Sequence, residues 1–298
     1  MKETILILHN PKAGDKDHQK NELVNAIKEA GYNAIYSSIR QKKWQKIDKA
    51  IDIILIVGGD GTVRKVASVL LKRTWLDKKL LLSLLPMGTA NNVALTLGSP
   101  DNIKKLLNRL AKKNIKKVDV GAVDLGVEQN FFLESFGVGL LPKLMREMEK
   151  IKTDNLESKE DEISLALHTL LTISLSYEAR QAHITIDGKK ITGKYLLIEV
   201  LNICSIGPNL KLAPEADMTD GLFEVVLLEE GQRDVFIEYV KNVALGKTKK
   251  GPWKIIRGRD IQIQWDGTWI HVDDEYVQLK DKTDLLVEAR PQILDFLS

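Results

Sequence analysis

An apolar segment that runs directly into a glycine turn is the strongest constraint on this chain. Residues 54–62 read Ile-Leu-Ile-Val-Gly-Gly-Asp-Gly-Thr. A continuous apolar strand is typical of a parallel sheet that is covered on both faces. Glycines let the backbone approach a ligand closely, and the helix that starts near Thr62 favours an anion at its N-terminus. The segment predicts a phosphate-binding loop in which Asp60 faces a divalent cation; an ordinary strand-to-helix turn is the alternative.

The composition bounds the class of protein. The chain has 298 residues, 44% of them hydrophobic, which is enough for one large core or two smaller ones. The net charge of +3 is too small to indicate nucleic-acid binding. With one cysteine, Cys204, and five scattered histidines, an internal disulfide is excluded and no zinc-type spacing appears.

No segment reads as a targeting or membrane-spanning element. The apolar run near the N-terminus is too short for a signal peptide. The longest apolar-rich stretch, Ile163–Tyr177, is shorter than the ~20 residues that a membrane span needs. We therefore expect a soluble, cytoplasmic protein.

Strands and helices alternate through the N-terminal part of the chain. We expect strands over Thr4–His9, Asn33–Ser37, Asp52–Val57 and Leu80–Leu85, and helices over His18–Ala30 and Val63–Leu71. This alternation predicts an α/β domain with a parallel sheet, in which ligands bind outside the carboxyl ends of the strands. Three polar loops, residues 10–14, 58–62 and 86–92, follow such strands and are expected to line one cleft.

The pattern changes from about Gly121 onward to shorter strands that alternate apolar and polar residues, as in an antiparallel sheet. We expect strands over Phe131–Phe136, His183–Ile186, Tyr195–Asn202, Phe223–Leu228, Ile261–Gln264, Trp269–Val272 and Leu285–Ala289, helices over Leu140–Ile151, Ile163–Tyr177 and Gln232–Leu245, hairpins at Asp187-Gly188 and Asp266-Gly267, and a charged linker over Lys152–Asp161. The expected domains are an α/β domain, residues 1–122 with 287–298, and a β-rich domain, residues 123–286.

A series of short motifs, in a specific order, resembles a known family over nearly the whole chain. The motifs are Asn10-Pro11 with Gly14, Gly58-Gly59-Asp60-Gly61-Thr62, Pro86-x-Gly88-Thr89-x-Asn91, Asp119-Val120-Gly121, Phe132–Gly139, Pro214-Glu215-Ala216 with Asp220-Gly221, and Val272-Asp273-Asp274-Glu275. The chain resembles the diacylglycerol kinase and sphingosine kinase superfamily, in particular the bacterial soluble lipid kinases. NAD kinases share the glycine loop and the two-domain fold, but here the third loop continues into Val93-Ala94-Leu95, as in lipid kinases.

The resemblance implies an ATP-dependent transfer of the γ-phosphoryl group to a hydroxyl of a diacylglycerol-like lipid at a membrane surface, with Mg²⁺. The implied nucleotide-binding residues are Asn10, Ser38, Gly58, Gly59, Asp60, Gly61, Thr62, Gly88, Thr89 and Asn91. Asp273 matches the general base, and Glu275 and Asp60 support it. Asp60 and Asp119 would hold the catalytic Mg²⁺ largely through water. A second ion would bind Asp220 with the backbone carbonyls of Asp217 and Leu222. The alternatives are a surface hairpin acid at Asp273 and a metal-free turn at Asp220.

Three departures from the family pattern leave other functions open. Arg64-Lys65 stand where relatives carry Asn-Glu, Asn92 stands where they carry Asp, and Asp274 replaces a glycine. The alternative functions are an NAD kinase and a non-catalytic nucleotide- or lipid-binding homologue. The acceptor also stays open among diacylglycerol, a sphingoid base, phosphatidylglycerol and an isoprenoid lipid.

Two lysine-rich segments are suited to an anionic membrane surface. They are residues 247–254, which include Trp253, and the pairs Lys112-Lys113 and Lys116-Lys117. Solvated loops are the alternative. The segment Ile163–Tyr177 would either flank an acyl-chain pocket or form a buried core helix. We expect a peripheral membrane contact, no nucleic-acid partner, and a homodimer as the commonest oligomer.

Overall fold

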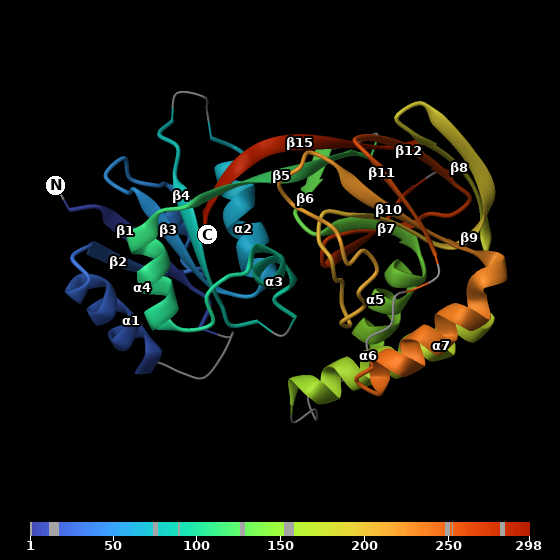
Figure 1. The fold of residues 1–298 in the computed structure, drawn as a ribbon, viewed down its shortest axis with the longest axis horizontal. Coiled ribbons are helices and arrows are strands. Elements are labelled where there is room, and N and C mark those ends of the chain that lie inside the picture. Colours follow the sequence, from blue (N-terminus) through green and yellow to red (C-terminus); the bar gives the residue numbers. More distant parts are fainter. Residues whose placement is uncertain are drawn as a thin grey trace. The chain divides into compact units, whose positions relative to one another are not determined.

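The computed structural model of the chain describes residues 2–11, 18–73, 77–88, 90–125, 129–151, 158–247, 251, 253–280 and 284–298. The chain divides into two units (Figure 1). Unit 1 comprises Met1–Val118 and Gln292–Ser298, and unit 2 comprises Asp119–Pro291. Among the described residues, no helix is long and apolar enough to cross a membrane.

Unit 1 is built on a parallel sheet with the strand order β2-β1-β3-β4, and the C-terminal end of β15 lies beside β4. Its strands are β1 (Thr4–His9), β2 (Asn33–Ser38), β3 (Ile53–Gly58) and β4 (Leu81–Pro86), and its helices are α1 (His18–Glu29), α2 (Asp60–Leu70), α3 (Asn92–Leu97) and α4 (Ile103–Lys112). The sheet is the expected one, since all four predicted strands form.

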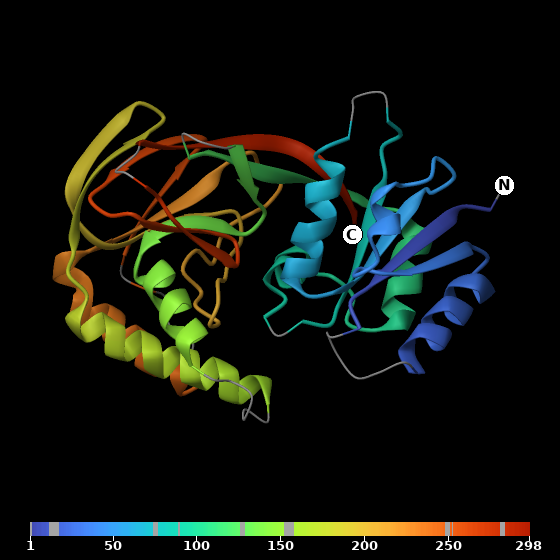
Figure 2. The same ribbon diagram turned by 180° about the vertical axis from the view of Figure 1, so that it is seen from behind.

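Alternation along the apolar strands places helices on both faces of this sheet. Ile5 and Ile7 of β1 share a core with Leu23 of α1 and with Leu106 and Leu110 of α4. Leu6 and Leu8 of β1 and Ile54 and Ile56 of β3 are buried as well, and α2 covers that opposite face (Figure 2). A strand that is buried on both sides reads as a continuous apolar run, which explains the sequence of β3.

Unit 2 is an antiparallel β structure with helices along one side. Its strands are β6 (Gln129–Phe132), β7 (Ser135–Gly139), β8 (Arg180–Ile186), β9 (Lys189–Leu201), β10 (Phe223–Glu229), β11 (Lys254–Gly258), β12 (Asp260–Trp265), β13 (Trp269–Val272) and β14 (Glu275–Gln278), and its helices are α5 (Leu140–Lys150), α6 (Lys159–Ser176) and α7 (Arg233–Ala244). Two long strands, β5 (Ile115–Asp124) and β15 (Asp284–Leu297), run from one unit into the other.

The central strand of unit 2, β9, separates two hydrophobic cores. Ile198 and Val200 face the interior of the β structure, together with side chains of β7, β8, β12 and β13. Leu197 and Leu201 face the other way and pack against α5, α6 and α7. Alternating side chains of one strand therefore bind the two layers together.

The predicted fold class is confirmed, and two local predictions are wrong. Phe131–Phe136 forms two strands, β6 and β7, with a turn at Leu133-Glu134, rather than one. Asp266-Gly267 does not form a hairpin, because β12 pairs with β8 and β15 whereas β13 pairs with β7 and β14. The hairpin at Asp187-Gly188 is confirmed: both residues have positive φ, and Ile186 pairs with Lys189.

The expected charged linker is only partly described. Residues 152–157 lie outside the described part of the chain, whereas Lys159 already begins α6. Ser158 caps this helix: its side chain accepts a hydrogen bond from the N–H of Asp161, and the Asp161 carboxylate bonds back to Ser158.

Candidate functional site

The loop after β3 contacts the loop after β4 at a pair of glycines, Gly59 and Gly88. A Cβ added to Gly59 would lie 2.8 Å from the Cα of Gly88, and a Cβ added to Gly88 would lie 2.5 Å from the Cα of Gly59. The side chain of Thr62 fills the corresponding space at Gly58. Glycine at these three positions is therefore required by close approach of neighbouring atoms.

The helix after this loop begins two residues earlier than expected. α2 starts at Asp60 with Gly59 as its N-cap, and the N–H groups of Thr62 and Val63 both donate to the carbonyl of Gly59. The amides of Asp60 and Gly61 precede these bonds, in the first turn, where helix N–H groups point toward an anion. The amides of Asp60 and Gly61, and not that of Thr62, are therefore the candidates for phosphate binding.

Asp60 holds the second loop in place. Its Oδ2 accepts the N–H of Asn92 at 2.9 Å, and its Oδ1 accepts the N–H of Val93 at 3.1 Å. The carboxylate thus satisfies two backbone donors at the start of α3. Asn92 is itself 4% exposed, so this contact lies in the interior of unit 1.

Asn91 also stabilises its own loop. It has a positive φ of 53°, its Oδ1 accepts the N–H of Gly88 at 2.7 Å, and its Nδ2 donates to the Gly88 carbonyl at 2.8 Å. The side-chain amide that was expected to contact nucleotide is turned toward Gly88. Thr89, and Gly14 of the first loop, lie outside the described residues.

Asn10 and Ser38 lie at the same edge of the sheet as the glycine loops. The parallel register pairs His9 at the end of β1 with both Ser38 and Val57. Asn10 follows directly, and its Nδ2 donates to Thr62 Oγ1 at 3.4 Å. The described nucleotide-binding candidates of unit 1 are therefore brought to the carboxyl ends of adjacent strands, which is where ligands bind in such sheets.

In unit 2, Asp273 is a buried turn residue. It is 6% exposed and forms, with Asp274, the two-residue connection between β13 and β14. Its φ of 53° is left-handed, a conformation that costs a residue other than glycine about 1–3 kcal/mol and clusters at functional sites. The alternative of a surface hairpin acid is excluded, whereas Asp274 and Glu275 beside it are exposed.

The carboxylate of Asp273 is anchored by backbone donors from the β6–β7 turn. Its Oδ1 accepts the N–H groups of Leu133 at 3.1 Å, Glu134 at 2.8 Å and Ser135 at 3.2 Å. The N–H of Asp273 donates in return to the Ser135 carbonyl at 2.8 Å. Three N–H donors stabilise the ionised form of a carboxylate.

Asp119 belongs to the same hydrogen-bond network as Asp273. Its side chain is fully buried, and its Oδ2 accepts the N–H of Gly221 at 2.6 Å. The Nδ2 of Asn202 donates both to the Asp119 carbonyl and to the Leu133 carbonyl, each at 3.0 Å. Asn202 thus connects Asp119 to the turn that anchors Asp273, although none of the sequence motifs includes it.

Of the groups predicted to bind a second metal ion, the Asp220 carboxylate has a cationic partner. Asp220 contacts the guanidinium of Arg257, which also donates to Glu224 at 3.1 Å. The Asp217 carboxylate accepts the N–H and hydroxyl of Thr219. Burial raises the pKa of Glu224 to about 7 even though Arg257 opposes the shift. The Asp220 carboxylate is therefore already paired with a cation, and binding of a second ion by Asp220 with the carbonyls of Asp217 and Leu222 stays a prediction.

Binding of a catalytic Mg²⁺ by Asp60 and Asp119 stays a prediction. Across the described ranges, no group of three or more His, Cys, Asp or Glu side chains gathers closely enough to hold an ion directly. Asp60 and Asp119 do offer hard carboxylate oxygens, the ligand type that Mg²⁺ prefers, and Mg²⁺ keeps most of its waters. These two residues stay the candidates for water-mediated binding.

A buried pair of side chains next to Asp273 was not predicted from the sequence. His271 and Glu199 are both 0% exposed, and their side chains meet at 2.8 Å. His271 lies two residues before Asp273, whereas Glu199 lies in β9, so only the strand register could have revealed the contact.

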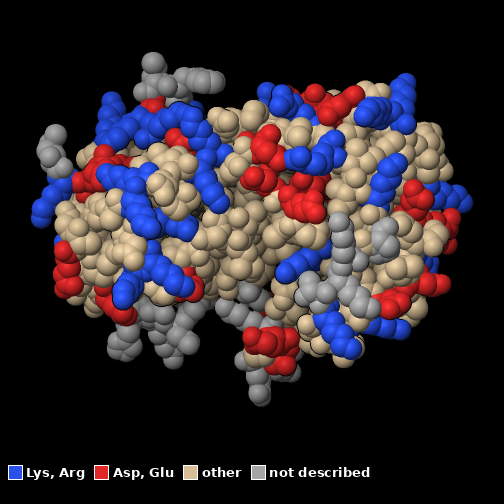
Figure 3. All heavy atoms as spheres, in the orientation of Figure 1, with Lys and Arg blue, Asp and Glu red and all other residues tan. Residues whose placement is uncertain are grey.

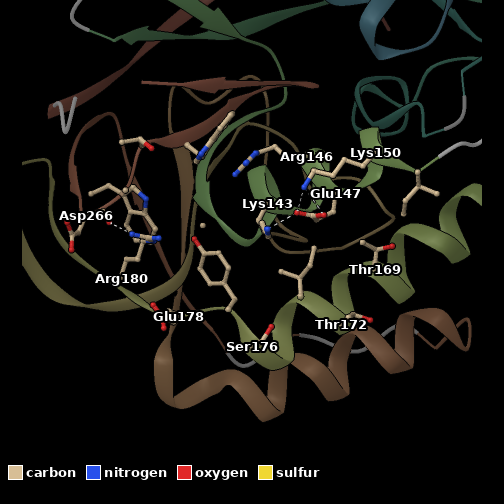
Figure 4. A pocket seen from close by; sticks show the side chains of 18 residues that line it. Lys143, Arg146, Glu147, Lys150, Thr169, Thr172, Ser176, Glu178, Arg180 and Asp266 are labelled. Carbon is tan, nitrogen blue, oxygen red and sulfur yellow. Dashed lines mark hydrogen bonds and ion pairs between the residues drawn. The ribbon is translucent and has the colours of Figure 1, made fainter. Parts of the chain in front are cut away.

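A pocket of about 980 Å³ lies in unit 2 between α5, α6 and the segment from Trp265 to Trp269 (Figure 4). We call it the α5–α6 pocket. Lys143 and Lys150 both donate to Glu147, and they lower its pKa to about 2. The guanidinium of Arg146 stacks on Trp269 at 3.6 Å. Arg180, across the pocket, donates to the Asp266 carbonyl.

Lysines and arginines also gather over α4 in unit 1 (Figure 3). The expected pairs Lys112-Lys113, at the end of α4, and Lys116-Lys117, in β5, are exposed, and Lys113 pairs with Glu3 at 2.6 Å. Of the second lysine-rich segment, residues 248–250 and 252 lie outside the described residues, and Trp253 is buried at 6% exposure rather than presented to a surface. Its indole N–H donates to the Leu212 carbonyl.

Comparison with known proteins places the chain in a family. Residues 4–123 match the model of the diacylglycerol kinase catalytic domain, and residues 148–298 match that of the YegS C-terminal NAD kinase beta sandwich-like domain. The chain is 24% identical to a diacylglycerol kinase of Bacillus subtilis over 281 residues, which cover 88% of this chain and 89% of that protein. It is 24% identical to a diacylglycerol kinase of Staphylococcus aureus over 288 residues, which cover 93% and 87%.

A solved structure shows the same fold. The crystal structure of a diacylglycerol kinase from Bacillus anthracis matches with a TM-score of 0.75 at 23% identity, over 99% of this chain and 96% of that chain. The fold of the solved structure, the order of the two matched domains and the extent of the sequence matches all indicate the same family. The chain therefore belongs to the diacylglycerol kinase and YegS family of lipid kinases.

Proposed function

We propose that this kinase transfers the γ-phosphoryl group of ATP to a hydroxyl of a diacylglycerol-like lipid, with Asp273 as the general base. The observation that carries the proposal is the state of Asp273: a buried carboxylate in a left-handed turn, anchored by three backbone N–H groups. Such an arrangement is costly for a structural aspartate and suits one that must stay ionised and point in a fixed direction.

In the proposed reaction, the lipid hydroxyl oxygen bonds to the γ-phosphorus as the bond from phosphorus to the β,γ-bridging oxygen breaks. The hydroxyl proton passes to the carboxylate of Asp273, and ADP leaves. The amides at the start of α2 hold phosphate oxygens, while the contact of Gly59 with Gly88 keeps the two loops close. A bound Mg²⁺ would neutralise charge on the phosphates.

The α5–α6 pocket supports a peripheral membrane contact. Its lining combines Lys143, Arg146 and Lys150, spaced along one face of α5, with the half-buried Trp269. Basic groups beside a tryptophan suit the headgroup layer of an anionic bilayer. Along β13 the pocket lies four residues from Asp273, roughly 13 Å at the usual rise of a strand.

The proposal is tested by a transfer assay with γ-labelled ATP and Mg²⁺, run in parallel on a total lipid extract and on NAD. We expect label in the organic phase, and mass spectrometry of that product names the acceptor. Label in NADP alone would contradict the proposal and favour an NAD kinase, the second candidate, which the match to an NAD kinase-like β domain supports. ATP binding without transfer to either acceptor would indicate a binding protein and equally overturn the proposal.

A further inference from the structure

The side chains of Glu199 and His271 meet beside a glycine of the strand that lies between their own strands. His271 of β13 pairs in register with Gly137 of β7, and Gly137 pairs with Glu199 of β9. The two side chains belong to strands that are roughly 10 Å apart, with β7 between them. A Cβ at Gly137 would lie 2.0 Å from Glu199 Oε1. Glycine in the middle strand therefore provides the space in which the imidazole and the carboxylate meet.

The hydrogen bonds of this pair fix the position of one proton. His271 Nδ1 lies 3.0 Å from the Asp273 carbonyl oxygen, and Nε2 lies 2.8 Å from Glu199 Oε2. A carbonyl only accepts, so Nδ1 carries a hydrogen and donates it to Asp273. A second proton lies between Nε2 and Oε2. Whichever of these two atoms holds it, the Nδ1–H bond to Asp273 is the same.

Burial of this pair favours the uncharged forms of both the acid and the base. It raises the pKa of Glu199. It also acts to lower the pKa of His271, an effect that Glu199 and Asp273 together more than offset through charge and hydrogen bonding. A buried ionic pair adds little stability over apolar residues of the same size. Stability alone therefore gives no reason for its presence beside Asp273.

The pair also binds the backbone carbonyl of Asp273. The carboxylate is anchored by the β6–β7 turn, and the backbone N–H donates to Ser135. The remaining group, the carbonyl, accepts from His271. Fixing this carbonyl fixes the peptide plane that follows Asp273, and with it the left-handed turn.

We propose that His271, held by Glu199, is a positioning residue for the lipid phosphorylation reaction: it donates to the Asp273 carbonyl and so sets the direction of the catalytic carboxylate. This inference rests on the proposed function of Asp273. Positioning errors near 1 Å cost on the order of 100-fold in rate, so loss of this hydrogen bond acts on turnover and not on nucleotide binding.

The test compares two substitutions of similar size. His271→Asn keeps an amide N–H near the position of Nδ1, and His271→Gln reaches toward Glu199 but has no donor for the Asp273 carbonyl. Turnover is measured with γ-labelled ATP on vesicles of dioleoylglycerol in phosphatidylglycerol, per mole of folded protein. We expect kcat to fall about 10- to 100-fold in His271→Gln and by less than about 5-fold in His271→Asn, with the same KM for ATP in both. Equal kcat values in the two variants would overturn the proposal.

Two controls separate this inference from the proposed function. Asp273→Asn is measured in the same series: if it retains wild-type turnover, the general-base role of Asp273 in the proposed function fails, whereas an inactive Asp273→Asn beside a fully active His271→Gln refutes only the positioning role. A readout independent of activity is the ¹⁵N spectrum of histidine-labelled protein, with the His271 signal assigned by its loss in His271→Asn. A protonated Nδ1 is expected, and an unprotonated Nδ1 would contradict the proposal.

Discussion

At the scale of single residues, the candidate site depends on a few contacts that other residue types could not make. Gly59 and Gly88 touch through their Cα atoms, and Asp60 holds the backbone of the next loop. The need for glycine could be predicted from the sequence, because a run of glycines directly after an apolar strand is typical of a loop that approaches phosphate. The partner of each glycine could not be predicted, because the two loops are far apart in the chain.

Gly88→Ala is expected to weaken ATP binding by at least about 10-fold and to lower the free energy of unfolding by about 1–3 kcal/mol. Its Cβ would lie 2.5 Å from Gly59 and 2.8 Å from Asn91 Oδ1, so the two loops must separate. The matched control is Gly231→Ala, where a Cβ meets nothing within 4 Å and φ is not positive. Isothermal titration and urea unfolding measure both effects, and equal ATP affinity in the two variants would contradict this account of the loop.

Asp60→Asn is expected to lower both ATP affinity and stability, the latter by about 1 kcal/mol. The asparagine keeps one oxygen acceptor and presents an NH₂ group to a backbone N–H, so Asn92 or Val93 loses its partner. Asp234→Asn, an exposed acid in the first turn of α7, is the control for charge alone. If Asp60→Asn binds ATP·Mg as tightly as Asp234→Asn, Asp60 does not organise the nucleotide loops.

At the scale of elements, the sequence predicted the strands better than their partners. The apolar runs of β1, β3 and β4 identify a parallel sheet because strands buried on both faces are typical of that architecture. The hairpin predicted at Asp266-Gly267 does not form, because a turn signal in the sequence does not indicate whether the strands on either side of it pair. The turn at Leu133-Glu134 could not be predicted within Phe131–Phe136, because the residues on both sides of it are apolar. This turn supplies N–H donors to Asp273.

The pairing of Glu199 with His271 was unpredictable for the same reason. It requires β9, β7 and β13 to be adjacent and in one register, with a glycine at the crossing point. No local pattern in the sequence carries this information. The ends of strands and their motifs can therefore be predicted, but the network behind Asp273 comes from the tertiary fold.

Arg146→Ala in α5 is expected to reduce turnover several-fold on vesicles that contain phosphatidylglycerol and to leave turnover in neutral detergent micelles unchanged. The guanidinium lies on Trp269 at the edge of the α5–α6 pocket, where it would meet an anionic headgroup. Lys105→Ala, an exposed cation of α4 in unit 1, is the control. An equal loss in micelles and vesicles would show that Arg146 acts on the fold and not on a membrane contact.

Metal removal is expected to leave the stability of the protein unchanged. Arg257 already neutralises Asp220 and Glu224, the place where the family resemblance implied a structural ion. The midpoint of thermal unfolding should be the same in EDTA and in Mg²⁺ without nucleotide, while Arg257→Ala lowers it in both. A clear rise of the midpoint with Mg²⁺ alone would reveal a structural ion that this arrangement does not predict.

At the scale of the whole molecule, the candidate residues for nucleotide binding and for catalysis lie in different units. Unit 1 holds the described candidates for nucleotide binding, and unit 2 holds Asp119, Asp273 and the groups that anchor them. Variants in unit 1 should therefore change ATP affinity, and variants around Asp273 should change turnover at constant affinity. This division follows from the location of the residues and does not depend on the identity of the lipid.

The measurement that tests the central claim most directly is phosphoryl transfer by Asp273→Asn, with Asp234→Asn as the matched control. γ-Labelled ATP, Mg²⁺ and the total lipid extract are used for all three proteins, and ATP affinity is measured in parallel. If Asp273 takes the proton of the lipid hydroxyl, its variant binds ATP like the wild type and loses at least about 100-fold in turnover, while Asp234→Asn remains active. Turnover of Asp273→Asn close to that of the wild type would contradict the assignment of the base, and with it the account of the site.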